Sequence, residues 1–329
     1  MSIKVLTAAA MAVLVLAGCH HPAYSQNNQC GNNGCGSAPV TGPFYSYWDL
    51  SDNRTRQALP EVASEVNLDT IAEQMPGGRD TQAYAAYNAN QLNTLIKFDQ
   101  GSLLLSQAYG QKAWVALEYV FFAQGAHLYS NWQTRWSQFA NQIAAYGSNI
   151  VAFTVKDEPY ESAIVNNIPI ATMQTELMEI VSAVRARFPN VKMACDCQPY
   201  TIVNGLSLSM FDWIGFDAYG ATAAQLNTYL GDIEVQYQIP ASGKRTFIVP
   251  DAYAPSVPAN PDSPTDPTIE TLSAQQPVYE TLMNEHPSVV AVIGFIYTTQ
   301  GGLFGLDKMP TVHALYSAWF QRLAAEGGK

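Results

Sequence analysis

The sequence predicts a single (β/α)8 barrel, an α/β fold, from three observations. From residue 43 onward, short apolar runs alternate with longer amphipathic ones, and no long linker separates them. Eight strand-like runs, seven helical segments between them and one closing helix fill roughly 290 residues, which is the count and length of this barrel. The alternative, a doubly wound open sheet, usually carries a Gly-rich phosphate loop after its first strand, and this sequence has none there.

Strands are expected where short runs of apolar and β-branched residues occur, and helices where apolar residues recur every three or four positions. The expected strands are residues 44–48, 66–71, 112–120, 150–157, 191–197, 211–218, 245–251 and 289–297. The clearest expected helices are residues 131–146, 168–188, 223–237, 269–285 and 311–325.

The N-terminus has the pattern of an export signal. Lys4 precedes an apolar run over residues 6–17, and small residues lead directly to Cys19. The run is shorter than the roughly 20 residues that span a bilayer. The pattern resembles a bacterial lipoprotein signal, which implies that residues 1–18 are removed and that a lipid on Cys19 anchors the protein to the membrane. Because His20 follows, it implies the outer membrane of the cell envelope. An ordinary signal peptide is the alternative.

Residues 19–42 are polar, Gly-rich and nearly uncharged, as in a flexible tether. Cys30 and Cys35 are spaced for a small disulfide loop in an oxidising compartment, and whether they pair stays open. The neighbouring histidines match no usual zinc spacing. We therefore expect the barrel domain to span residues 43–329.

The composition narrows the choice of partners. Only 13% of the residues are charged, 18 are tyrosines, and the net charge is −11. A polyanion such as DNA is repelled by this charge, so we expect no nucleic-acid partner. A polar surface built from uncharged side chains is common in exported proteins. We expect a monomer.

Side chains alternate between the two faces of a strand, so each strand can be sorted into a helix-facing and a barrel-facing side. In the fourth strand, Val151, Phe153 and Val155 share the face expected under the helices. Lys156 and Glu158 share the other face and are expected in the mouth of the barrel.

The same sorting brings further carboxylates to the mouth. It turns Glu118, Asp196 and Asp217 inward on the third, fifth and sixth strands. The seventh strand is ambiguous because Pro250 interrupts its pattern, but it ends in Asp251. Enzymes of this fold place their chemistry at the carboxyl ends of the strands, and clustered carboxyls shift one another's pKa values. The alternative is a structural ion network in which a lysine neutralises Glu118 and Asp196.

Cys195 and Cys197 fall on the helix-facing side of the fifth strand. We expect them to pack as small apolar side chains, and a strained bridge between them stays open.

Two segments carry a resemblance to a family. Asp157-Glu158-Pro159 resembles the Asn-Glu-Pro motif of the retaining glycoside hydrolases of clan A, and the segment FDWIGFDAY at residues 211–219 resembles that clan's sixth-strand pattern. The resemblance implies a (β/α)8 barrel that hydrolyses O-glycosidic bonds of a polysaccharide or oligosaccharide, with Glu158 as the general acid/base.

The seventh strand departs from the clan, which has a glutamate nucleophile there. This sequence reads FIVPDAY at residues 247–253, with Pro250 in the place of the glutamate. Three readings follow: Asp251 is the nucleophile, Asp217 is the base of an inverting reaction, or catalysis has been lost. The separation of the two carboxyls distinguishes the first two, at about 5 Å for retention and about 6.5–9.5 Å for inversion.

Sugar rings bind on flat apolar surfaces, and aromatic residues are frequent near the expected strand ends. The catalytic candidates are Glu158, Asp251 and Asp217. The candidates for substrate binding are Trp48, Glu118, Asp157, Asp196, Tyr219, Tyr253 and Tyr297.

The sequence lacks the motifs of several other enzyme classes. The sequence contains no Gly-x-Ser-x-Gly elbow, no His-Glu-x-x-His and no P-loop. We expect no cofactor and no metal, with a carboxylate-held divalent ion as the alternative. We therefore predict that the protein is a glycoside hydrolase. The alternative functions are a carbohydrate-binding protein without a working nucleophile and a structural envelope lipoprotein.

Overall fold

The computed structural model describes residues 43–47, 66, 68–71, 103, 107, 110–123, 127–199, 205–255, 269–295 and 303–327. Eight parallel strands lie side by side in chain order, and the first strand also lies against the second, so the sheet closes into a barrel. The strands are β1 (Phe44–Tyr47), β2 (Leu68–Ile71), β3 (Lys112–Ala116), β6 (Ile150–Thr154), β7 (Lys192–Cys197), β8 (Trp213–Asp217), β9 (Arg245–Val249) and β11 (Val289–Gly294). The predicted (β/α)8 fold is confirmed.

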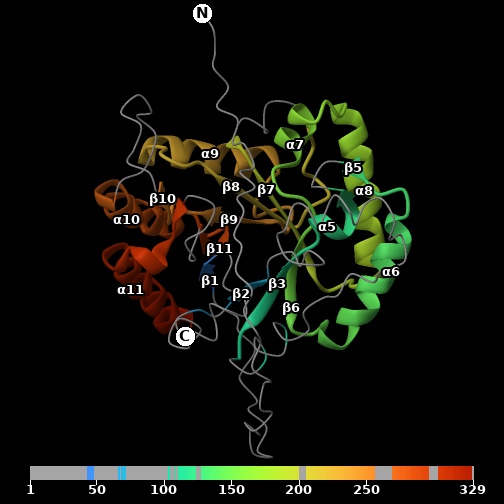
Figure 1. Cartoon of the computed structure of the whole chain (residues 1–329). Coiled ribbons are helices and arrows are strands. Elements are labelled where there is room, and N and C mark those ends of the chain that lie inside the picture. The colour runs from blue at the N-terminus through green and yellow to red at the C-terminus, as the bar shows by residue number, and fades with distance from the viewer. Residues whose placement is uncertain are drawn as a thin grey trace, which may run out of the picture.

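Helices surround the strands, with α6 and α8 on one side, α9 across the top and α10 and α11 on the other side in Figure 1. The helices are α5 (Glu118–Phe121), α6 (Trp132–Ile143), α7 (Pro159–Val165), α8 (Ile170–Arg187), α9 (Ala223–Gln236), α10 (Ile269–Glu285) and α11 (Pro310–Gly327). Short two-stranded pairs join β4 (Phe122–Ala123) to β5 (His127–Leu128) and β10 (Ala254–Pro255) to β12 (Leu303–Phe304).

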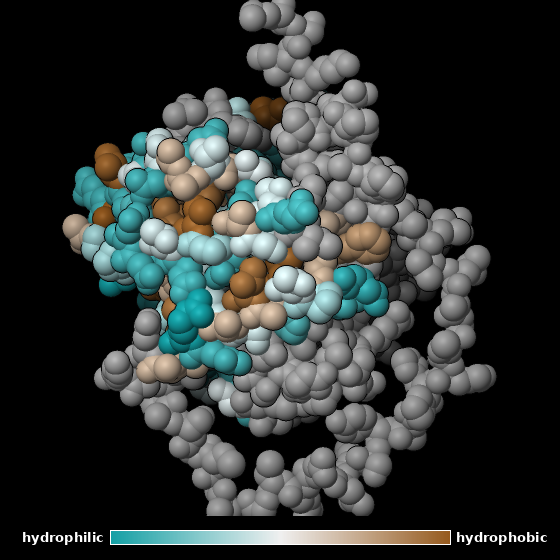
Figure 2. Space-filling view, turned by 90° about the vertical axis from the view of Figure 1, so that its left-hand side faces the viewer, coloured by the Kyte–Doolittle hydropathy of each residue, from teal (hydrophilic) through white to brown (hydrophobic). Residues whose placement is uncertain are grey.

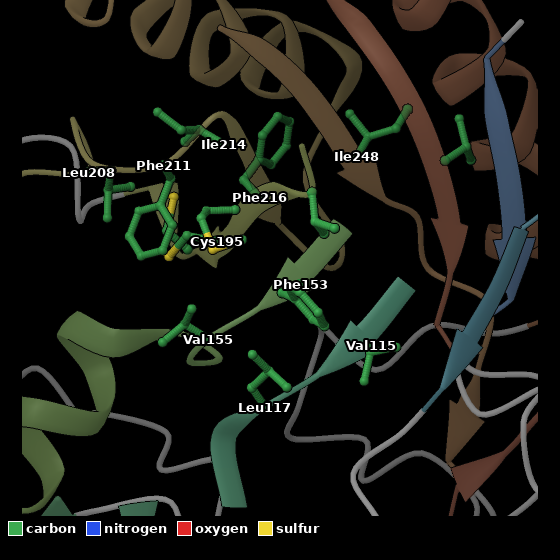
Figure 3. Packing of buried hydrophobic residues seen from close by; sticks show 14 of the residues in the cluster. Val115, Leu117, Phe153, Val155, Cys195, Leu208, Phe211, Ile214, Phe216 and Ile248 are labelled. Carbon is green, nitrogen blue, oxygen red and sulfur yellow. The ribbon is translucent and has the colours of Figure 1, made fainter. Parts of the chain in front are cut away.

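Apolar side chains on the outer face of the strands pack under the helices. Figure 3 shows part of this outer layer, including Phe153 and Val155 of the fourth strand and its continuation. Both were predicted on this face. Val151 is an exception, because it is half-buried and packs against the inner cluster. It is the extra residue of a β-bulge: Ile150 pairs with Ala113 and Ala152 with Trp114, so Val151 lies between the two pairs.

The third strand is shorter than predicted, and residues 117–120 are not part of it. Leu117 leaves the extended conformation, with φ −114° and ψ 0°, and the one-turn helix α5 starts at Glu118. The Leu117 N–H donates to the Thr154 carbonyl at 2.7 Å, so the neighbouring strand fixes this turn. Glu118 still follows the carboxyl end of the strand.

The interior of the barrel combines large and small side chains. Trp114, Trp213 and Phe247 fill it, with ring centroids 5.3 Å apart between the two tryptophans and 4.9 Å apart between Trp114 and Phe247. Gly215 provides the space for one of these rings, because a Cβ at this position would lie 2.3 Å from the ring of Phe247. Such layers of complementary size make the interior a packed core rather than a pore.

Hydrophilic residues cover much of the described surface on the face that Figure 2 shows, and apolar residues form small separate groups there. Among the described residues, no helix is long and apolar enough to cross a membrane. The export signal, Cys19, the tether and the Cys30–Cys35 pair lie outside the described residues and stay predictions.

Replacing Gly215 by alanine tests the packing of the interior. The new methyl group collides with the Phe247 ring, and overpacking of this kind costs about 1–3 kcal/mol of the free energy of unfolding. Urea denaturation of Gly215→Ala measures this loss. Gly231→Ala is the matched control, since no atom lies within 4 Å of its added Cβ in α9. It is expected to be neutral or to stabilise by up to about 1 kcal/mol. Equal stabilities of the two variants would contradict the packing described.

Candidate active site

Five carboxyl groups gather where four neighbouring strands end. Glu118 follows β3, Asp157 and Glu158 follow β6, Asp196 lies near the end of β7, and Asp217 ends β8. These four strands are adjacent in the barrel, so their carboxyl ends meet at one side of its mouth. The structure therefore brings together five of the residues that the sequence analysis singled out.

A buried lysine pairs with the first of these carboxyls. Lys156 forms an ion pair with Glu118, and their side chains are only 2% and 13% exposed. The Lys156 ammonium also lies 5.3 Å from the centre of the Phe122 ring. Burial raises the pKa of Glu118 to about 7, opposed by the charge of Lys156. The Asp157 N–H donates to the same carboxylate, so Glu118 fixes the chain where β6 leads into the next turn.

Glu158 has an unusual backbone conformation, with φ 37° and ψ 60°, in the left-handed region. This conformation costs a non-glycine residue about 1–3 kcal/mol and persists only where the surroundings enforce it. Pro159 begins α7 directly afterwards, and the Glu158 carbonyl accepts the Ser162 N–H at 2.9 Å. The start of this helix and the anchored Asp157 hold the Glu158 side chain in one direction.

Glu158 and Asp217 form a pair. Their carboxyl groups hydrogen-bond to each other. Gln198, directly after β7, lies between them in the strand order, and its Nε2 donates to Glu158 and, at 3.2 Å, to Asp217 Oδ1. Three side chains from the ends of three successive strands are thus joined in one hydrogen-bonded group.

Both pKa values of the pair are raised. Burial is the largest cause for Glu158, followed by the charge of Asp157. Burial is also the largest cause for Asp217, and the charges of Asp196 and Glu158 add to it. Two carboxyls in contact cannot both ionise readily, so they titrate as one system that retains a proton above the ordinary range of such groups.

Two more acids adjoin this pair. Burial raises the pKa of Asp196 well above its usual value, and the charges of Asp157 and Glu158 raise it further. Its Oδ1 accepts the Cys197 N–H at 3.0 Å. Asp157 is exposed to solvent, yet the protein surrounding it is dense enough to raise the pKa of its carboxyl. This combination is expected of a side chain that lines an open concave mouth.

Asp251 has a different environment. It is fully buried, and its Oδ2 accepts the Gly220 N–H at 2.9 Å. The side chain of Gln275 in α10 also hydrogen-bonds to it, and Tyr316 donates to its main-chain oxygen at 2.7 Å. Burial raises the pKa of Asp251 to about 6. The groups that contact its carboxylate belong to the turn after β8 and to α10, not to the Glu158 pair.

Three aromatic rings lie together after β8, β9 and β11. Tyr219 lies 5.3 Å from Tyr253 and 5.8 Å from Phe295, measured between ring centroids, and Tyr253 lies 5.8 Å from Phe295. All three are half-buried. The two tyrosines were predicted as substrate-binding residues, whereas Trp48 and Tyr297 lie outside the described residues.

Gln198 and Phe295 belong to the site but were not predicted as site residues. Gln198 lies two residues after Asp196, so alternation puts both on the inward face, but an amide does not titrate and gives no signal of acid–base chemistry. Phe295 shares the inward face with Ala291 and Ile293, both in the inner cluster, so the same alternation would have identified it.

Cys195 and Cys197 are free thiols, both buried in the outer layer, as predicted for small packing residues. The Cys197 thiol lies 3.1 Å from the Gly215 carbonyl oxygen. Across the described residues, no group of three or more His, Cys, Asp and Glu side chains is arranged to hold a metal ion.

Comparison with solved structures identifies proteins with a similar barrel. A β-1,4-mannanase of family GH113 aligns with a TM-score of 0.51 and 13% identity over 86% of this chain and 99% of its own. Xylanase 10B from Thermotoga petrophila RKU-1 aligns with a TM-score of 0.54 and 10% identity over 85% and 94%. The β-D-glucuronidase from Dictyoglomus thermophilum aligns with a TM-score of 0.55 and 13% identity over 84% and 50%.

No family model and no curated protein matches this chain. At identities of 10–13%, the structural likeness concerns the fold. The chain therefore shares a (β/α)8 barrel with glycoside hydrolases.

Proposed function

We propose that this protein is a glycoside hydrolase that cleaves O-glycosidic bonds of a polysaccharide or oligosaccharide. Glu158 is its general acid/base, and Asp217 is its second carboxylate. The observation that carries the proposal is the hydrogen-bonded Glu158–Asp217 pair at the carboxyl ends of β6 and β8. Support comes from the Asp-Glu-Pro motif and from a barrel shared with a mannanase, a xylanase and a glucuronidase.

Hydrolysis of a glycoside requires one group that donates a proton and one that carries a negative charge, and a pair of carboxyls can provide both. The leaving oxygen is a poor leaving group and needs a proton while the bond to the anomeric carbon breaks, and the positive charge that develops on the sugar needs a carboxylate. Two carboxyls that share one proton contain one acid and one anion. The raised pKa of Glu158 is the direction required of a group that delivers a proton near neutral pH.

The two carboxyls are in hydrogen-bond contact, which is closer than in either class of glycoside hydrolase and nearer to the spacing of the retaining class. Inverting enzymes keep their carboxyls about 6.5–9.5 Å apart to admit a water, whereas retaining enzymes keep them about 5–5.5 Å apart. In the proposed reaction, Asp217 forms a bond to the anomeric carbon as Glu158 protonates the departing oxygen. Water then gives a proton to Glu158 and its oxygen to the anomeric carbon, which releases Asp217.

The aromatic group of Tyr219, Tyr253 and Phe295 provides an apolar surface for a sugar ring beside the pair. Asp157 and Asp196 offer acceptors for sugar hydroxyls, and Glu118 supports the turn that carries the acid. We further propose that the protein is a monomer on the outer membrane, anchored through a lipid on Cys19 and acting on carbohydrate in the cell envelope.

A second candidate function is carbohydrate binding without turnover. Pro250 occupies the place of the expected clan A nucleophile, and the neighbouring Asp251 carboxylate is engaged with Gly220. If Asp217 does not replace that nucleophile, the mouth binds sugar and does not cleave it.

Release of reducing ends by the purified protein tests the proposed function. On a panel of bacterial and plant polysaccharides, Glu158→Gln is expected to lower kcat/KM by about a hundredfold or more, since general acid–base catalysis contributes about 10²–10⁴. Asp217→Asn is expected to reduce turnover at least as strongly, because it removes the second carboxylate.

Glu179→Gln is the matched control, because it removes an exposed carboxylate on α8 and should leave turnover unchanged. Turnover that survives in Asp217→Asn would exclude Asp217 as the second carboxylate. Binding of saccharide by the wild type without any release would establish the second candidate function instead.

The pH dependence of kcat/KM follows from the paired carboxyls. Only the singly protonated pair contains both an acid and an anion, so activity is lost when a second proton binds at low pH and when the shared proton leaves at high pH. Since the pKa values of both groups are raised, the alkaline limb is expected well above the roughly 4–4.5 of ordinary carboxyls. Measurement of kcat/KM from about pH 3 to about pH 9 checks this, and an alkaline limb near 4 would contradict it.

Asp251 is expected to act on stability rather than on the reaction. Its pKa is about 6 in the folded protein and about 3.9 in an unfolded chain. The folded state therefore binds this proton more tightly. Its contribution to the free energy of unfolding is greatest below about pH 4 and falls by about 3 kcal/mol as the pH rises through 6.

Asp251→Asn removes this charge and keeps an oxygen for the Gly220 N–H. Relative to wild type, the variant is expected to gain up to about 3 kcal/mol at about pH 8 and little at about pH 4, as measured by urea denaturation. The same difference at both pH values would show that the buried charge is not its cause.

A further inference from the structure

The group of Glu158, Gln198 and Asp217 contains one member that does not titrate. Gln198 directly follows β7, which lies between β6 and β8, so its side chain is flanked by the ends of the two strands that carry the acids. Its Nε2 donates to Glu158 and to Asp217 Oδ1. A single amide nitrogen thus connects both carboxyls of the pair.

We propose that Gln198 is a positioning residue, whose side-chain amide holds the Glu158 and Asp217 carboxyls together as one pair that shares a proton. The inference deepens the proposed function and rests on it for its catalytic meaning. The hydrogen bonds that join the three side chains do not depend on that function.

The chemistry of the amide suits this task better than other side chains do. Its Nε2 carries two N–H donors, so it can serve two acceptors at once without giving up a proton to either. A lysine in this place would neutralise the pair and lower both pKa values, and a carboxylate would repel it. An amide lets one proton and one negative charge remain on the two acids.

The charges that face the pair make this donor important. Asp157 faces it from the end of β6, Asp196 from β7 and Glu161 from α7, and all three are acidic. The nearby Lys156 is paired with Glu118. The hydrogen bond from Gln198 lowers the pKa of Glu158 against the effect of these acids and of burial. It therefore favours the form of the pair in which one carboxyl is ionised.

Gln198→Met tests the proposal, because methionine matches the length of glutamine and has no N–H donor. Carboxyl-carbon NMR titration of Glu158 and Asp217 in the purified protein is the main measurement. A hydrogen bond to a charged group contributes about 1.5–3 kcal/mol and one pKa unit equals about 1.36 kcal/mol, so the lower pKa of the pair is expected to rise by about one unit or more. Gln133→Met on the exposed side of α6 is the matched control and should leave this titration unchanged.

Enzyme kinetics provide the second readout. In Gln198→Met the acid limb of kcat/KM is expected to shift upward with the lower pKa of the pair, and kcat to fall about tenfold or more with a smaller change in KM, because the carboxyls lose their alignment. A purely structural glutamine would lower the melting temperature and leave the acid limb in place.

Gln198→Glu covers the case in which the methionine variant does not fold. Its side chain has the shape of glutamine but adds an acid, so it is expected to raise the pKa values of the pair at least as much as Gln198→Met. A titration unchanged in both folded variants overturns the inference. If the titration shifts in the variants but the wild-type protein releases no sugar, the role of Gln198 is supported and the proposed function is refuted. The two failures are therefore distinguishable.

Discussion

The site depends on one constraint, which is the alternation of side chains along closed, parallel strands. Each strand gives one set of residues to the layer under the helices and the next set to the interior, as Cys195 and Asp196 illustrate in β7. Because all eight strands run in the same direction, their inward carboxyl-terminal residues meet at one mouth. A shift of one residue in β7 would exchange Asp196 and Gln198 for the cysteines and remove the amide donor from the Glu158–Asp217 pair.

Burial then gives the collected carboxyls their chemical character. Glu118 has a buried lysine as its partner, so its charge is compensated by an ion pair. Glu158 lies two residues beyond that lysine, among Asp157 and Asp196, and has an amide and another carboxyl as partners instead. A carboxyl in such surroundings keeps its proton more readily. The left-handed backbone of Glu158 is strained and lowers the stability of the protein, and the surrounding contacts keep the residue in this conformation.

Alternation explains what the sequence predicted and what it did not. It predicted that Glu158, Asp196 and Asp217 lie close together, as they do, because alternation resumes after the Val151 bulge in β6 and is regular in β7 and β8. It failed at Val151, where a bulge adds a residue. Leu117 lies in the outer layer, but the third strand was predicted too long, because the hydrogen bond from Leu117 to Thr154 marks the point where the chain turns into a helix. Both events depend on the neighbouring strand, which is not visible within a single segment.

The seventh strand bears on where the proposed second carboxylate lies in the barrel. Pro250 has no N–H to donate, and Asp251 turns its carboxylate to Gly220, so this strand end serves the packing of the barrel. Neighbouring strands lie about 4.8 Å apart, which puts β6 and β8 about 10 Å from each other across β7, within reach of two inward side chains. β9 is one strand further away. An acid on β8 therefore meets Glu158 more directly than one on β9, with the residue after β7 between them. For this reason the amide of Gln198 can donate hydrogen bonds to both Glu158 and Asp217 and hold them together.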